Sequence, residues 1–226
     1  MNDILKTFFA VSVALALIYL LWQKLQQARA RATATPDILF SNVKSLFENV
    51  KIEPGQTNGS WKLTGTYRDS YFQLQIITDT LSTRKLPSLW LMITLPTPQN
   101  ISGVIDMMIR PAGPSTFSNF DFLSFTLPTP NDFPEHAVIR TNDPKTRLPV
   151  EAIHPHLALL KNRHTKELLI APKGLRIVTM LAEAERARYG VFREADFGEI
   201  GLELAAVQQI LDTLIALDKE LNARNA

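Results

Sequence analysis

Imidazole side chains bind metals and transfer protons near neutral pH, so the four histidines of this chain are the first candidates for chemistry. His154 and His156 flank a proline and could bind one zinc ion together, with His164 or Glu151 as a third ligand. The proline disrupts the regular spacing that places two histidines on one helix face, and the chain has no cysteine. We therefore expect these histidines, and His136, to be surface or helix-capping residues rather than metal ligands.

Two acidic residues are candidates for acid–base catalysis, in which one side chain donates a proton and another accepts it. Asp106 lies among apolar residues in a strand-like stretch, where burial would raise its pKa. Asp121 lies in a segment rich in phenylalanine. The favoured interpretation of Asp106 is nevertheless a solvent-facing strand residue.

The sequence motifs of several enzyme and nucleotide-binding classes are absent. There is no G-x-S-x-G nucleophile elbow and no G-x-G-x-x-G fingerprint, and the stretch 55–60 lacks the lysine of a phosphate-binding loop. A net charge of +2 without a dense basic patch argues against a nucleic-acid partner. We assign no catalytic, cofactor-binding or metal-binding residue and interpret the chain as non-enzymatic. An enzyme whose pocket carries no known motif is the alternative.

A long apolar segment at the N-terminus is the strongest signal in the chain. Residues 7–22 contain no charged residue, no glycine and no proline. A helix needs roughly 17–25 apolar residues to cross a bilayer. The segment reaches this length over about residues 4–23 if Lys6 and Lys24 extend to the two interfaces. Trp22 lies near one end, where interfacial aromatic residues are common.

A cleaved signal peptide is the alternative for this segment. Small residues at 28–34 resemble a cleavage site, but Asp3 offsets the basic Lys6, and the apolar run exceeds the usual length of about 7–15 residues. We therefore favour an uncleaved anchor that contacts the lipid bilayer. The basic residues Lys24, Arg29 and Arg31 lie on its C-terminal side and predict a cytoplasmic C-terminal domain. An extracytoplasmic domain, behind a signal peptide or a reversed anchor, is the other possibility. The predicted units are an anchor at 1–24, a linker at 25–35 and a soluble domain at 36–226.

Alternation of apolar and polar residues predicts a mainly antiparallel sheet of five to seven strands in this domain. The short connections between the strands favour hairpins over alternating strands and helices. The expected strands are 61–67 and 72–76, joined by a hairpin, a central strand at 89–95, a strand at 103–110, and a hairpin formed by 166–170 and 175–179.

Apolar residues at helical spacing predict two helices that flank the sheet, at 37–50 and 202–223, and a short helix at 152–161. Between Pro111 and Pro149, frequent prolines and phenylalanines predict a long ordered segment with short edge strands near 121–127 and 137–141. Its phenylalanines are expected to dock onto the core, with a groove for a partner or lipid as the alternative.

The sequence therefore predicts an α+β protein with one N-terminal transmembrane helix followed by a mainly antiparallel sheet domain with flanking helices. The predicted function is that of a single-pass membrane-anchored interaction or accessory protein that acts next to the membrane, with a membrane protein as its partner. The apolar stripe of the helix at 202–223, or the phenylalanine-rich segment, is the expected contact surface.

Overall fold

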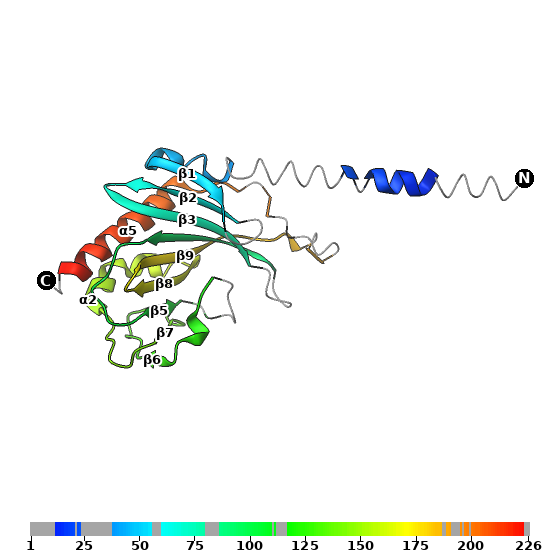
Figure 1. Ribbon diagram of the computed structural model, residues 1–226. Coiled ribbons are helices and arrows are strands. Elements are labelled where there is room, and N and C mark those ends of the chain that lie inside the picture. Colours follow the sequence, from blue (N-terminus) through cyan, green and yellow to red (C-terminus); the bar gives the residue numbers. More distant parts are fainter. Residues whose placement is uncertain are drawn as a thin grey trace, which may run out of the picture. The chain divides into compact units, whose positions relative to one another are not determined.

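Figure 1 shows the computed structural model of the chain. It divides into two compact units, Met1–Leu39 and Phe40–Ala226. The residues that the structure describes are 12–20, 22–23, 38–55, 60–79, 86–109, 111, 117–186, 189–190, 195, 197–198 and 200–223.

In the first unit, residues 12–20 and 22–23 are helical. Among the described residues of the chain, no helix is both long and apolar enough to cross a membrane. The other positions of the predicted span, 4–11 and 21, lie outside the described residues, as does the whole predicted linker.

The second unit is built on one nine-stranded sheet in which every neighbouring pair of strands is antiparallel. The strands follow the order β1-β2-β3-β4-β9-β8-β5-β7-β6 across the sheet (Figure 1). Their bounds in chain order are Glu48–Pro54 (β1), Trp61–Tyr67 (β2), Ser70–Asp79 (β3), Ser88–Leu95 (β4), Ile105–Met108 (β5), Phe125–Leu127 (β6), Val138–Thr141 (β7), Thr165–Ala171 (β8) and Gly174–Glu183 (β9).

This sheet confirms the predicted antiparallel architecture but has more strands than expected. The sequence patterns located β2, β3 and β4 and the β8–β9 hairpin, and β4 lies in the interior of the sheet, as predicted. The expected hairpin between β2 and β3 turns at Arg68 and Asp69, which both have positive φ (45° and 63°), as in the tight turns that match strand twist. Of the two strands predicted at the edge, only β6 lies there, because β7 pairs on both sides.

The predicted helix at 37–50 is wrong in its second half. The chain forms only short helical turns there, at 38–40 and in the 3-10 helix η1 (Lys44–Leu46), before β1 begins. β1 is the strand at the other edge of the sheet, and its first residues, 48–50, were expected to continue the helix.

Long-range packing explains this difference. Phe47 is buried, as the helical pattern required, but its ring packs on Tyr67 of β2, with the ring centroids 6.2 Å apart. Asn49 then adopts φ 53°, which a helix does not allow, at a β-bulge in the pairing with β2. The same apolar spacing thus suits either a continuous helix or a turn followed by a strand. Only the pairing with the distant strand β2 selects the strand.

The predicted helix at 202–223 is confirmed as α5 (Leu204–Ala223), which lies along one face of the sheet (Figure 1). Its apolar stripe is buried: Val207, Ile210, Leu211, Leu214, Leu217 and Leu221. The hydroxyl of Tyr67 donates a hydrogen bond of 2.9 Å to Asp212 of this helix. Because the stripe faces the sheet, it is not the exposed contact surface that was expected of it.

The predicted short helix at 152–161 is present as three consecutive pieces: α2 (Val150–Ile153), the 3-10 helix η3 (His154–His156) and α3 (Leu157–Leu160). The break falls at Pro155, whose ring cannot continue a regular helix. Most of the apolar residues of α2 and α3 are buried and extend the core.

Two adjacent rows of residues, one on each face of the sheet, differ in polarity across its whole width, and we name the face of the more polar row the polar face. Residues directly opposite each other in neighbouring strands share a face. One row is apolar in all nine strands: Ile52, Leu63, Leu74, Ile93, Ile177, Leu168, Met107, Ile139 and Leu127. The adjacent row on the other face is polar except at one position: Lys51, Thr64, Gln73, Thr94, Arg176, Leu169, Asp106, Arg140 and Thr126.

Candidate functional site

The polar face contains two fully buried carboxyl groups. Asp106 on β5 is 1% exposed, and Glu167 on β8 is 0% exposed. The strand register places both on this face, since Glu167 pairs with Met108, two residues from Asp106. A buried carboxylate is costly unless it is paired, so each group needs a partner.

Arg176 of β9 supplies the partner for Glu167. Its Nη2 lies 2.9 Å from Glu167 Oε2, and its Nε donates a hydrogen bond of 3.1 Å to the same oxygen. Both contacts use one oxygen, so Oε1 of Glu167 is buried without a hydrogen-bond partner, and so is Oδ1 of Asp106. One proton shared between the two carboxyl groups would satisfy both of these oxygens.

The electrostatics of Asp106 agree with a shared proton. Burial, the largest cause, and the charge of Glu167 together raise its pKa to about 8, against the opposing effects of Arg176 and of the hydrogen bond from Ser118. A hydrogen bond with Glu167 also acts in the direction of protonation. Two acids and one guanidinium carry a net charge of −1 when ionised, and the proton removes this excess.

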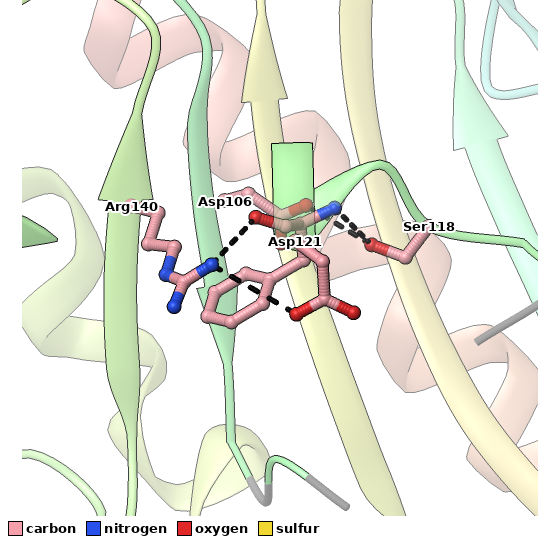
Figure 2. Close-up of polar contacts among 5 residues, drawn as sticks. Asp106, Ser118, Asp121 and Arg140 are labelled. Carbon is pink, nitrogen blue, oxygen red and sulfur yellow. Dashed lines mark hydrogen bonds and ion pairs between the residues drawn. The ribbon is translucent and has the colours of Figure 1, made fainter. Parts of the chain in front are cut away.

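A short segment covers Asp106 on the polar face, and we name residues 117–123 the strap. Ser118 Oγ donates a hydrogen bond of 3.2 Å to Asp106 Oδ2 and accepts one of 3.2 Å from the Phe120 amide (Figure 2). The 3-10 helix η2 (Phe120–Phe122) follows, and Phe120 itself is buried. At the start of the strap, the ring of Phe117 packs on Trp90 of β4, with centroids 5.6 Å apart.

Arg140 of β7 holds the strap from the other side. Its Nη1 donates a hydrogen bond of 3.3 Å to the Phe120 carbonyl oxygen, and its guanidinium lies 4.7 Å from the Phe120 ring centroid. Asp121 lies 3.8 Å from the same nitrogen (Figure 2). Arg140 is also directly opposite Asp106 in the register of β5 and β7, so both side chains leave the same face side by side.

Two aromatic side chains face solvent here, Phe122 within the strap and Phe125 just after it, and we name them the aromatic edge. Phe122 is 84% exposed, and Phe125, on the edge strand β6, is 40% exposed. Phe120 and Phe133 in the same part of the chain are buried, so the expectation that the phenylalanines dock onto the core holds for some and is wrong for the aromatic edge.

The two acids that the sequence singled out, Asp106 and Asp121, lie in different environments. Asp106 was expected to face solvent, which is wrong, because the strap covers it. Its burial and raised pKa match the chemistry considered for it. Asp121 has an exposed side chain and contacts Arg140.

The histidines occupy separate settings. His154 Nε2 lies 2.9 Å from Asp132 Oδ2 at the surface, and His164 Nε2 accepts a hydrogen bond from its neighbour Arg163. Burial lowers the pKa of the half-buried His156. Among the residues that the structure describes, no group of three or more histidine, cysteine or acidic side chains is placed to hold a metal ion.

Sequence reasoning missed Glu167, Arg176, Arg140 and Ser118. A signal existed for the first two, because the predicted β8–β9 hairpin places opposite charges at 167 and 176 on one face of a strongly apolar pair of strands. No comparable signal existed for Arg140 and Ser118, whose approach to Asp106 depends on the pairing of β5 and β7 and on the path of the strap.

Hollows elsewhere on the domain are lined by other described residues, and two of them are compared with the site. One, of about 540 Å³, is lined by residues of α5 and by His156, and the acid on its wall, Asp212, is already bound by Tyr67 and Arg68. The other, of about 300 Å³, lies between the start of α5 and the strands β8 and β9 and has walls of mixed polarity. Neither is lined by Asp106 or Glu167, so the buried acids do not face a substrate-sized space there.

The arrangement can therefore store one proton at a closed position and couple it, through Ser118 and Arg140, to the strap. No protein-family model, curated protein or solved structure matches the chain.

Proposed function

We propose that the chain is a single-pass membrane-anchored interaction or accessory protein, non-enzymatic, that binds a membrane-protein partner through the aromatic edge. The apolar segment at 7–22 supports the anchor. The observation that carries the binding role is the 84% exposure of Phe122 on a strap that its neighbours hold in place. A large apolar side chain that is exposed on a backbone held by its neighbours loses little backbone entropy on binding, which favours its use as an interface hot spot.

The strand beside it supports the same role. β6 is an edge strand, so one side of its backbone is not paired within the sheet. Its sequence, Phe125-Thr126-Leu127, carries no charge. The opposite edge, β1, carries a bulge, Lys51, Glu53 and a terminal proline, which are features that prevent edge pairing. An extended segment of a partner protein would add to β6 by main-chain hydrogen bonds and cover the aromatic edge.

The anchor would strengthen such an interaction. A tethered domain meets membrane partners at a raised effective concentration, so a small contact suffices. The basic residues Lys24, Arg29 and Arg31 favour a cytoplasmic domain, and we therefore look for the partner among proteins with cytoplasmic segments.

Photo-cross-linking of the full chain in its native membrane tests this proposal. A photoreactive phenylalanine analogue replaces Phe122 in one variant and Tyr71 in the control, since Tyr71 is also an exposed aromatic residue (48%) but lies on β3. We expect a discrete membrane-protein adduct from position 122 and not from position 71.

A second substitution separates specific binding from proximity. Phe125→Lys places a charge on the edge strand and should reduce the adduct from position 122 by at least about tenfold, which corresponds to about 1.4 kcal/mol of binding free energy. Tyr71→Lys should leave that adduct unchanged. Equal adducts from both positions, or an adduct insensitive to Phe125→Lys, would contradict the proposed surface.

A further inference from the structure

We infer that Asp106, Glu167 and Arg140 form a proton-operated latch that fixes the strap, and with it Phe122, while the two acids share a proton, and releases the strap when that proton is lost. The inference rests on the proposed function, because Phe122 belongs to the strap. It concerns how the aromatic edge is presented rather than what binds there.

In the closed state, in which the two acids share a proton, each group makes a distinct interaction. The shared proton satisfies Asp106 Oδ1 and Glu167 Oε1, which have no other hydrogen-bond partner. Asp106 Oδ2 accepts the hydrogen bond of Ser118, which ties the acid to the strap. Arg140 is left to bind the carbonyl oxygen and ring of Phe120.

Loss of the proton to solvent changes the balance of charge. Both acids are then anionic, Arg176 neutralises one of them, and one buried negative charge has no counter-ion. The charged groups around this position are Glu167 and Lys166 of β8, Arg176 of β9, Arg140 of β7 and Asp121 of η2. Lys166 lies over the Trp90 ring, at 6.0 Å, and Arg176 is already bound to Glu167.

Arg140 is the cation best placed to compensate. It lies directly opposite Asp106 in the sheet, so its side chain can turn to the new carboxylate without any change in the strands. Its present partners are weaker by comparison: a neutral carbonyl oxygen, an aromatic ring and the exposed Asp121 at 3.8 Å. When Arg140 turns, Phe120 loses its hydrogen bond and its cation–π contact together, and the strap is freed.

Trp90 reports the state of the latch directly, because Phe117 of the strap packs on its ring and Trp90 is 9% exposed. In the full chain in detergent, Trp22→Phe and Trp61→Phe leave Trp90 as the only tryptophan. The measurement is quenching of its fluorescence by acrylamide, a neutral quencher, between about pH 6 and about pH 9.5, on either side of the raised pKa of Asp106.

We expect the quenching constant to rise severalfold with pH in this protein. Asp106→Asn keeps the shape of the side chain, and its amide can donate to Glu167, so this variant should stay at the low value throughout. A pH effect that arises from any other group near Trp90 would persist in Asp106→Asn, and the difference between the two proteins therefore isolates Asp106. Arg140→Gln should give the high value at both ends of the range, and Asp121→Asn should keep the transition.

A transition that survives in Asp106→Asn, or no transition in the parent protein, would overturn the latch. The experiment uses no partner, so its result is independent of the cross-linking at position 122. A Trp90 transition without any adduct from position 122 would support the latch and contradict the proposed binding surface. An adduct without a Trp90 transition would support the proposed binding surface and contradict the latch.

Discussion

Asp106 is a candidate acid in the sequence, a buried residue of the sheet and a member of the inferred latch. Its carboxyl group is buried on the polar face, it accepts the hydroxyl of Ser118, and its second oxygen faces Glu167. At such a position a carboxyl group is retained at a cost, since a neutral side chain of the same shape avoids the burial of charge. This cost sets the direction of the pH dependence of stability.

The pKa of Asp106 is raised to about 8 in the folded chain from an ordinary value of 3.8. Between these values the folded state binds more protons than the unfolded state, so stability falls as the pH rises. The contribution of this residue is complete at a pH below the ordinary pKa and is lost as the pH passes through the raised pKa. We predict that Asp106→Asn removes this decline and makes the full chain more stable than the parent protein above about pH 8.

Urea unfolding of both proteins in detergent, at a series of pH values, checks this prediction. The matched control is Asp121→Asn, the same substitution at an exposed side chain of the strap. It should leave the slope of stability against pH unchanged. Parallel curves for the parent protein and Asp106→Asn would contradict the assignment of the decline to Asp106.

At the scale of the elements, the β8–β9 hairpin sets the geometry of the acid pair, because it carries both Glu167 and Arg176. The register of the hairpin depends on its turn at Gly174, which has φ 147°. A Cβ atom there would collide with the carbonyl oxygen of Leu95 in β4. The glycine is therefore required both by its backbone conformation and by the close approach of a third strand.

Gly174→Ala tests the role of this turn. We expect it to lower the free energy of unfolding by more than about 1 kcal/mol, because the new methyl group meets backbone rather than a flexible side chain. Gly190→Ala is the matched control, since a Cβ atom there has no neighbour within 4 Å. Urea unfolding of the two variants gives the comparison, and equal losses at both positions would contradict the prediction.

The sequence predicted those elements whose pattern is local. Strands β2 and β3 and the β8–β9 hairpin show alternation and turn residues, and α5 has a continuous apolar stripe. The first residues of β1, 48–50, were assigned to a helix because the apolar spacing that leads up to them suits both structures, and only the pairing with β2 selects the strand. The position of β5 in the sheet could not be predicted from the sequence either. β5 lies between β8, which is far from it in the sequence, and β7, which follows it after a long connection.

In the candidate site, too, the residues with a local sequence signal could be predicted and those placed by long-range contacts could not. Asp106 could be singled out from its apolar neighbours, and Glu167 with Arg176 from the predicted hairpin. Ser118 and Arg140 could not, because they reach Asp106 through the strap and the β5–β7 pairing. Burial of Asp106 was therefore not predicted, since the residues that cover it come from other parts of the chain.

The whole molecule combines an apolar N-terminal segment with a folded domain that presents the aromatic edge. The domain alone would offer a small contact: two phenylalanines and a three-residue edge strand. Such a contact gains in effect when both partners are confined to one membrane. The proposed role of the aromatic edge therefore depends on the claim that the chain is anchored in a membrane.

Alkaline extraction of membranes that contain the full chain with a C-terminal tag tests this claim most directly, with the mass of the tagged protein read from the same gel. Ala14→Lys together with Ala16→Lys, which places two charges within the apolar segment, serves as the control. We predict that the parent protein stays in the membrane pellet at full-length mass and that the control variant is extracted. Release of the parent protein, or a mass smaller by about thirty residues as expected of signal-peptide cleavage, would contradict the account.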